Sequence, residues 1–305
     1  MITKRVAFVG KPEVGKTTIK KVIFEGEDPN ELVLFPLEAT IGIKYSVHEF
    51  MDMKISLLDT PGQSLPILLQ DEEKQIASFE NTGAIIYIFD YPTWITDSQD
   101  IIDDIQTLYT INKKRDFGSK IVLFLHKVDL LIDKKIGSRL DLIGKQINKQ
   151  LDLPEDFPIY FTSLHPNLIY TIYNAISDTF SNFSKDTSKL KEIVKKTIKN
   201  SSKTICFVSN KEGNLIIQSS SPDFDTTTLY YLYEKIYQSS KATEQPISNS
   251  KFINAGSKLL CMLIEDIGKF HPNFKNLLFF SETLGENNLN EFANEIEKDL
   301  GQIYI

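Results

Sequence analysis

The segment GKPEVGKT, at residues 10–17, has the residue types and spacing needed to hold a phosphate. It fits the pattern GxxxxGK[ST], in which the glycines let backbone N–H groups curl around a phosphate. The dipole of the helix that follows adds positive potential there. Lys16 is expected to reach the β- and γ-phosphates of a nucleotide, and the Thr17 hydroxyl to bind Mg²⁺. The predicted nucleotide-binding residues of this segment are Gly10, Glu13, Val14, Gly15, Lys16, Thr17 and Thr18.

Two further segments contain residues suited to magnesium and to a γ-phosphate. Asp59 begins the sequence DTPGQ after an apolar strand pattern, where a carboxylate can hold Mg²⁺ through water. In the same segment, Gly62 lets a backbone N–H approach the γ-phosphate, and Gln63 can orient an attacking water. Thr40, in the loop before that strand, can give its hydroxyl to Mg²⁺ and its amide to the γ-phosphate. The predicted metal ligands are Thr17, Thr40 and Asp59, and the predicted catalytic residues are Lys16, Thr40 and Gln63.

The sequence HKVD, at residues 126–129, follows the apolar run IVLFL and is suited to reading a guanine base. The carboxylate of Asp129 can accept hydrogen bonds from N1–H and the 2-amino group of guanine, which adenine cannot supply. The stem of Lys127 can cover the face of the base. A third segment, at residues 162–164, ends the last predicted strand, where a backbone N–H would bind the guanine carbonyl. We therefore expect the base of GTP or GDP to contact His126, Lys127, Asp129, Ser163 and Leu164.

The elements that must position these residues alternate between strand and helix patterns, which predicts βα units and a mainly parallel sheet. Each chemical motif follows one of the predicted strands. Short apolar strands are predicted at residues 5–9, 54–58, 84–89, 121–125 and 159–161, with helical spacing after the first, third and last. The fold class predicted for this part of the chain is therefore an α/β nucleotide-binding domain over residues 1–185.

The rest of the chain has a different pattern, which begins after a polar segment at residues 184–188. It predicts a helix at 190–198, a hairpin of residues 204–209 and 214–219, strands at 259–264 and 277–280, and a closing helix at 289–300. A further helix is marked by Leu229, Leu232, Tyr233 and Ile236. This order predicts a smaller α+β domain over residues 186–305, and we expect the helix of Leu229 to be its dimer contact.

Composition excludes several classes of protein. The chain of 305 residues is 41% hydrophobic and 25% charged, as in a soluble protein of two domains. A net charge of −7 argues against nucleic-acid binding, which needs clustered basic residues. The sequence predicts neither membrane insertion nor lipidation, so we expect a cytoplasmic protein that reaches a membrane surface only through a partner. Cys206 and Cys261 lie in apolar runs and are predicted to be buried thiols.

The five motifs, in their order and spacing over residues 10–164, resemble those of the small GTPases. His126 stands where most of that superfamily has Asn, and HKxD resembles the Rag/Gtr family. The segments LHKVDL, ATIG, TGAIIYIFD and FTSL are also similar to that family. Rag-type GTPases have a C-terminal roadblock-like domain, and residues 186–305 have a similar order of elements.

The resemblance implies a switch that binds GTP or GDP with Mg²⁺ and signals nutrient state to a TOR kinase complex. It implies dimerisation through the C-terminal domain, either with a second copy or with another Rag-like GTPase. It also implies a roadblock-domain scaffold and a GTPase-activating protein as partners. EATIG is similar to one branch of the family, whereas PGQ and HKVD are similar to the other, so the sequence leaves the homodimer and the heterodimer open.

Two features predict slow intrinsic hydrolysis. Pro12 occupies a position where Gly is common, and its fixed φ and missing N–H alter the approach of a glutamine or arginine to the γ-phosphate. The few arginines, among them Arg5, Arg115 and Arg139, suggest no internal arginine finger. An outside activator is then expected to supply several kcal/mol of transition-state stabilisation.

Two alternatives to a hydrolysing GTPase stay open at this point. One is a pseudo-GTPase scaffold that binds nucleotide without hydrolysis; the presence of Lys16, Thr17, Asp59 and Gln63 argues against it. The other is an ATP-dependent P-loop enzyme, in which Asp129 only caps a helix. Comparable affinities for ATP and GTP would favour this second alternative.

Overall fold

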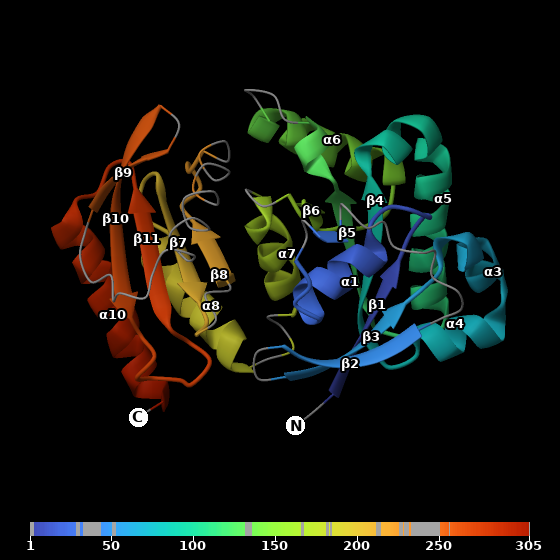
Figure 1. Cartoon of the computed structure of the whole chain (residues 1–305), viewed down its shortest axis with the longest axis horizontal. Coiled ribbons are helices and arrows are strands. Elements are labelled where there is room, and N and C mark those ends of the chain that lie inside the picture. The colour runs from blue at the N-terminus through green and yellow to red at the C-terminus, as the bar shows by residue number, and fades with distance from the viewer. Residues whose placement is uncertain are drawn as a thin grey trace. The chain divides into compact units, whose positions relative to one another are not determined.

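The computed structural model describes residues 3–28, 31–32, 44–50, 53–131, 136–165, 168–180, 183, 185–211, 215–225, 228, 232, 251–255 and 257–304. The chain divides into two compact units, Met1–Ala175 and Ile176–Ile305 (Figure 1). The division falls inside helix α7 (Tyr170–Phe180), earlier than the boundary expected from the polar segment after residue 183.

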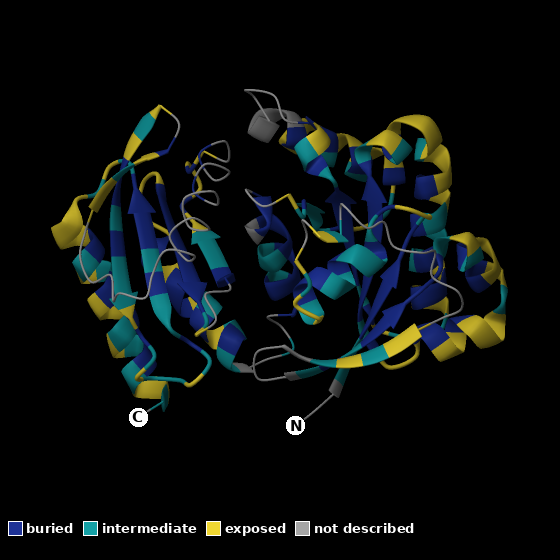
Figure 2. Ribbon diagram, viewed as in Figure 1, coloured by how far each residue is buried: buried dark blue, intermediate teal, exposed yellow. Residues whose placement is uncertain are grey.

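The first unit contains a six-stranded, mainly parallel sheet with the strand order β2-β3-β1-β4-β5-β6. Its strands are β1 (Thr3–Val9), β2 (Lys44–Phe50), β3 (Met53–Asp59), β4 (Thr82–Asp90), β5 (Lys120–His126) and β6 (Ile159–Phe161). Every pairing is parallel except that of β2 with β3. The central strands β4 and β5 are almost wholly buried (Figure 2), which explains why they read as continuous apolar runs. The predicted α/β fold class is confirmed.

Helices cover both faces of this sheet; in Figure 1, α1 and α7 lie on one side and α4 and α5 on the other. The helices are α1 (Lys16–Phe24), α3 (Leu65–Gln70), α4 (Glu72–Phe79), α5 (Tyr91–Lys114), α6 (Ile136–Leu151) and α7, with 3₁₀ turns η1 (Gly62–Ser64) and η2 (Val128–Leu131). Sequence reasoning missed α3, α4 and α6. Asp71 separates the first two, because its side chain accepts the amides of Glu73 and Lys74 and so starts α4.

The second unit contains a five-stranded antiparallel sheet with the order β8-β7-β11-β10-β9. Its strands are β7 (Thr204–Ser209), β8 (Leu215–Ser220), β9 (Lys251–Ala255), β10 (Lys258–Asp266) and β11 (Asn276–Ser281), and its helices are α8 (Lys185–Ile198) and α10 (Glu286–Tyr304). This is the α+β arrangement predicted from the order of the elements. Of the predicted dimer helix, Leu232 is described and fully buried. The other three, Leu229, Tyr233 and Ile236, lie outside the described residues.

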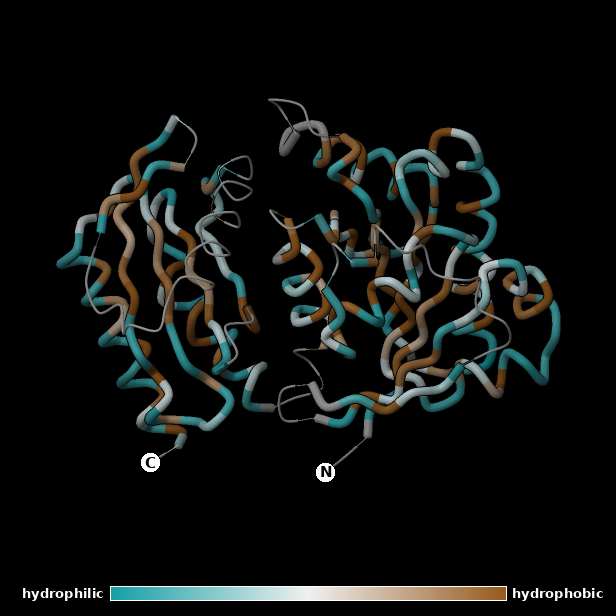
Figure 3. Tube along the Cα trace, in the orientation of Figure 1, coloured by the Kyte–Doolittle hydropathy of each residue, from teal (hydrophilic) through white to brown (hydrophobic). Residues whose placement is uncertain are grey.

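Hydrophobic residues run along the strands of both units and recur in their helices (Figure 3), and many of them are buried in the two cores. Cys206 and Cys261 are part of the second of these cores, and both thiols are buried, as predicted. Within the described ranges, no helix is long and apolar enough to cross a membrane.

Candidate nucleotide-binding site

The loop between β1 and α1 requires glycine at two positions. Gly10 has φ 144°, and a Cβ built on it would lie 2.0 Å from the carbonyl oxygen of Ile88 on the neighbouring strand β4. Gly15 has φ 96°, also in the left-handed region that favours glycine. Helix α1 begins directly after it, and the first amides of a helix have no intrahelical partners. The loop and the helix together therefore have the geometry of a P-loop, in which free backbone amides can accept an anion.

Lys16 is folded across this loop. Its side chain is buried, and Nζ donates hydrogen bonds to the carbonyl oxygens of Gly10 at 2.9 Å and Lys11 at 2.5 Å. Burial lowers the pKa of Lys16 to about 8, against the opposing effect of the nearby Asp59 carboxylate. The ammonium group is thus held at the rim of the loop, where a bound phosphate would be within its reach.

Asp59, at the end of β3, lies beside Thr17. Its Oδ2 accepts a hydrogen bond from the Thr17 hydroxyl at 2.8 Å, and the residue is 1% exposed. Burial raises the pKa of this carboxyl group, although the hydroxyl of Thr17 and the charge of Lys16 act in the opposite direction. Among the described residues, Asp59 Oδ1 has no hydrogen-bond partner. The pair therefore offers oxygen ligands of the kind that hard divalent cations prefer. Thr40, the third predicted metal ligand, lies outside the described residues.

The DTPGQ segment lies directly on the P-loop. A Cβ built on Gly62 would be 2.2 Å from the backbone nitrogen of Pro12, so no side chain fits at this position. Thr60 fixes the start of the segment, because its hydroxyl donates to the carbonyl of Phe8 at 2.8 Å. Gln63 is exposed in the middle of the short turn η1. The structure thus brings the predicted phosphate and catalytic segments together.

His126 ends β5 and begins the HKVD segment (residues 126–129), which we call the base-recognition loop. It lies against the P-loop. It is 2% exposed, and its Nδ1 is hydrogen-bonded to the Thr162 hydroxyl at 2.9 Å. A Cβ on Gly15 would lie 2.9 Å from the ring carbon Cδ2, so the imidazole packs against the P-loop backbone. Burial, together with the charge of Lys127, lowers the pKa of His126 to about 4. The ring is therefore neutral at neutral pH.

Asp129 is held by the loop that follows β6. Its Oδ1 accepts a hydrogen bond from the Ser163 hydroxyl at 2.5 Å. The Ser163 oxygen in turn accepts the amide of His165 at 2.9 Å, and the Ser163 amide donates to the hydroxyl of Thr171 at 2.9 Å. Leu164 follows Ser163 directly and is half-buried. The sequence predicted that Asp129 and residues 163–164 contact the same base, but it contained no signal for the bond between Asp129 and Ser163 or for Thr171, which anchors the loop of Ser163 to α7.

Lys127 links the base-recognition loop to the P-loop and to the end of β4. Its backbone has φ 58°, and its Nζ donates to the carbonyl oxygen of Glu13 at 2.8 Å and to Asp90 Oδ2 at 2.7 Å. The bond to Glu13 reaches the P-loop. Asp90, at the end of β4, is a site residue that sequence reasoning missed.

The conserved region of Gtr1/RagA G proteins matches residues 5–239 of this chain, which is more than half of its length. The chain therefore belongs to the Gtr1/RagA G protein family. The resemblance inferred from HKxD and its neighbouring segments is confirmed, and the match extends past the P-loop unit into the second unit.

Individual relatives match the chain at modest identity. GTP-binding protein gtr2 of Schizosaccharomyces pombe is 28% identical over 185 residues, which cover 58% of this chain and 55% of that protein. Ras-related GTP-binding protein C of Mus musculus is 26% identical over 178 residues, 56% of this chain and 43% of that protein. GTPase Era of Buchnera aphidicola is 30% identical over 151 residues, 47% of each chain. The chain thus spans about half the length of the curated relatives it matches.

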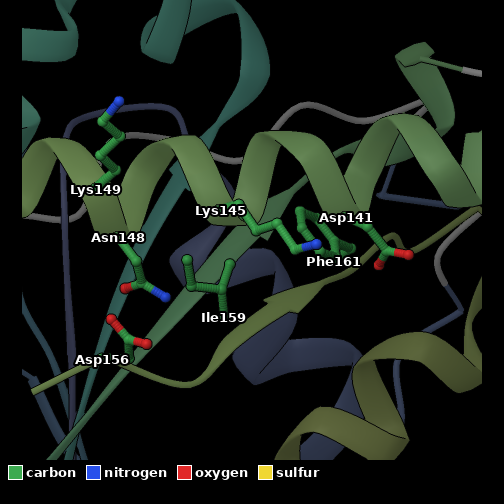
Figure 4. Close-up of a pocket in the computed structure, with 8 residues that line it drawn as sticks. Asp141, Lys145, Asn148, Lys149, Asp156, Ile159 and Phe161 are labelled. Atoms are coloured by element: carbon green, nitrogen blue, oxygen red, sulfur yellow. The ribbon is translucent and has the colours of Figure 1, made fainter. Parts of the chain in front are cut away.

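A separate cavity of about 450 Å³ lies between α6 and β6 (Figure 4). Ile159 and Phe161 contribute apolar surface, whereas Asp141, Lys145, Asn148, Lys149 and Asp156 contribute polar groups. Its lining contains none of the predicted nucleotide-binding residues. The cavity is therefore distinct from the site built by the P-loop and the base-recognition loop.

Proposed function

We propose that this Gtr1/RagA family member binds GTP and GDP with Mg²⁺, hydrolyses GTP slowly and acts as a nucleotide-dependent switch. One observation carries the proposal. The P-loop follows β1, and Asp59, which pairs with Thr17, ends β3. Asp129 and Ser163, which pair with each other, follow β5 and β6. All four are parallel strands of one sheet. Because ligands bind at the carboxyl ends of such strands, the three groups form a single nucleotide site.

In this site the P-loop residues hold the phosphates. Gly10, Gly15 and the start of α1 supply backbone amides, and Lys16 exchanges its bonds to loop carbonyls for bonds to phosphate oxygens. Thr17 and Asp59 would hold Mg²⁺, together with Thr40 from the part of the sequence that precedes β2. When bound, Mg²⁺ neutralises charge on the β- and γ-phosphates. The role of Gln63 is to orient the attacking water.

Asp129 and Lys127 recognise the base. The Ser163 hydroxyl fixes one carboxylate oxygen of Asp129, so that the carboxylate is already oriented when guanine binds. Lys127 covers the face of the base with its stem, and the amide of Leu164 donates to the guanine carbonyl. Adenine presents no donor pair to Asp129, so its binding desolvates the carboxylate and leaves it with only the hydrogen bond from the Ser163 hydroxyl.

Hydrolysis depends on an outside activator in this proposal. Two arginine side chains are described. The guanidinium of Arg5 donates to the carbonyls of Ala77 and Glu80, and that of Arg115 pairs with Glu72, so neither of these two is directed at the P-loop. An arginine from an activating protein is then the source of the missing transition-state charge.

Single-turnover hydrolysis of GTP by the purified chain tests this proposal against the pseudo-GTPase alternative. We expect a slow, measurable rate that is lost when EDTA removes the divalent cation and restored by added Mg²⁺. A rate equal to that of GTP in buffer, in a preparation shown to bind GTP, would support the non-hydrolysing scaffold instead.

We also propose that the second unit is a dimerisation domain that pairs with a second copy or with another Rag-like GTPase. Strand β9 lies at one edge of its sheet. Two large apolar side chains are exposed near this edge, Phe252 on β9 at 71% and Leu259 on the neighbouring strand β10 at 59%. They are diagonal neighbours on the β9–β10 hairpin, since Phe252 is opposite Cys261 and Leu259 is opposite Asn254. An unpaired edge next to exposed apolar residues is a typical pairing surface. Because Leu232 is buried, we assign the contact to β9 rather than to the helix of Leu229.

Light scattering of the full chain tests the dimer. The double variant F252D/L259D should be a monomer at concentrations where the parent is a dimer, because two charges would be desolvated in the contact. The matched control carries F252L and L259V. A parent chain that stays monomeric both alone and with a co-expressed Rag-like partner would contradict the proposal. A roadblock-domain scaffold and an activating protein are proposed as further partners of the dimer.

A further inference from the structure

Asp90 is a buried acidic residue between the two functional ends of the site. It ends β4, the strand that lies between β1 and β5 in the sheet. The P-loop follows β1 and the base-recognition loop follows β5, so the end of β4 lies between both loops. In the β4–β5 ladder, Asp90 is opposite His126. The residue is 5% exposed, and an acidic side chain is seldom so buried unless it has partners.

The two carboxylate oxygens of Asp90 have different partners. Oδ1 accepts the amide of Thr93 at 2.9 Å and its hydroxyl at 2.5 Å, which caps the start of α5. Oδ2 accepts the ammonium of Lys127 at 2.7 Å. Burial acts to raise the pKa of Asp90, but the hydrogen bonds from Lys127 and Thr93 outweigh it, so that the pKa is lowered. Asp90 is therefore an ionised carboxylate with a charge-assisted bond to Lys127.

Lys127 uses the same ammonium group to reach the P-loop, where the carbonyl of Glu13 accepts a bond at 2.8 Å. Both Lys127 and Glu13 have positive φ, at 58° and 61°. Residues other than glycine adopt such angles only where their surroundings hold them there. The chain of contacts from Asp90 through Lys127 to Glu13 thus fixes the path of the Lys127 stem between the two loops.

We propose that Asp90 is a positioning residue for nucleotide binding. It holds the Lys127 stem in a fixed position beside the bound base and so slows nucleotide release. This inference rests on the nucleotide site proposed above. Neither contact of Lys127 involves the region of Gln63 or Gly62, so the effect of Asp90 is the same for GTP and GDP. It changes the lifetime of the bound state, not the choice of base.

The first test replaces Asp90 by Asn in the full chain. Asp90→Asn keeps the shape of the side chain and an acceptor for the Thr93 amide, but it removes the charge that holds Lys127. We expect a fluorescent GDP analogue and a GTP analogue both to dissociate roughly tenfold faster, the effect of one lost charge-assisted bond. The matched control is Thr93→Val, which loses only a hydroxyl bond to the other carboxylate oxygen and should release both nucleotides at the parental rate.

A double-mutant cycle separates positioning from a merely structural role. Lys127→Met keeps most of the stem and removes the ammonium, so a further Asp90→Asn change should accelerate release by no more than about twofold. Full additivity of the two effects would overturn the inference, as would parental release rates for Asp90→Asn. If Asp90→Asn does not fold, Asp90→Ser takes its place, because serine also caps a helix.

Failure of this inference is distinguishable from failure of the proposed site. Asp129→Asn should shift preference from GTP towards xanthosine triphosphate, whereas Asp90→Asn should leave that preference unchanged. A shift with Asp129→Asn but no faster release with Asp90→Asn would reject the role of Asp90 alone. No shift with Asp129→Asn would instead reject the base site on which the inference rests.

Discussion

In the nucleotide site that we propose, the phosphate end and the base end are built in different ways. At the phosphate end the backbone defines the site: Gly10 and Gly62 leave no room for a Cβ, and the start of α1 supplies amides. At the base end side chains define it, through the pairs His126–Thr162 and Asp129–Ser163. A backbone cradle accepts any nucleotide triphosphate, whereas oriented side chains select one base. Changes at the first end should therefore affect all nucleotides, and changes at the second should affect selectivity and lifetime.

The largest effect is expected from Lys16→Met, which removes the ammonium of the phosphate end. GTP, GDP and ATP should all lose about 4 kcal/mol of binding free energy, roughly a thousandfold, because two charge-assisted bonds to phosphate disappear. Calorimetric titration measures it. A loss confined to GTP would contradict the division between the two ends.

Lys16 also makes phosphate binding depend on pH. Because its pKa is about 8 instead of 10.5, the free protein loses this proton as the pH rises past 8, and nucleotide affinity should then fall. The free energy of unfolding should instead rise between pH 8 and 10.5. Over that range the unfolded chain still binds the proton that the folded protein has released. Lys16→Met should remove both dependences.

The next effect concerns His126 at the base end. Its pKa of about 4 lies below the ordinary 6.5, so as the pH falls from 6.5 to 4 the unfolded chain takes up a proton that the folded protein excludes. The folded state should lose about 3 kcal/mol of stability over that range from this group. Denaturant unfolding at several pH values measures it. The matched variant is His126→Asn, since most small GTPases have Asn here. Its loss of unfolding free energy between pH 6.5 and 4 should be smaller by that amount. An equal loss in variant and parent would show that His126 is not the group responsible.

A smaller effect, which depends on the base of the nucleotide, is expected from Asp129→Asn. An amide donor would then face a guanine donor, and GTP should bind more weakly by at least about 2 kcal/mol. Xanthosine triphosphate should gain affinity, because it presents an acceptor at that position. Competition between the two nucleotides is the measurement, with Asp141→Asn on α6 as a control that should behave like the parent. Unchanged GTP affinity would remove Asp129 from base recognition.

The smallest expected effect on affinity is that of Gln63→Leu. In the proposed mechanism the exposed Gln63 orients water and does not contact the phosphates. GTP affinity should therefore stay within about twofold while the single-turnover rate falls at least about tenfold. Equal rates for variant and parent, with and without an activating protein, would exclude Gln63 from the mechanism.

The contrast between the two ends also explains what the sequence could predict. The P-loop was predictable because its glycines and Lys16 lie within eight consecutive positions, and β4 and β5 because both are continuous apolar runs. Asp90 was not predictable, because its bond to Lys127 joins residues 37 positions apart. In the sequence around it, Asp90 looks like any polar residue that ends a buried strand. Thr171 was missed because no motif in the sequence marks its hydroxyl as the acceptor of the Ser163 amide. Strand β2 was missed because it is an edge strand that alternates polar and apolar residues and leaves Tyr45 and Val47 exposed.

Native mass spectrometry of the purified full chain, followed by competition of ATP against bound GTP, tests the central claim most directly. We predict that the protein carries GDP or GTP from its host cell, and that even a large excess of ATP does not displace the guanine nucleotide. The spectrum also shows whether each complex contains one chain or two. Displacement by ATP at concentrations comparable to those of GTP would contradict the account, because Asp129 and its supporting residues would then not select guanine.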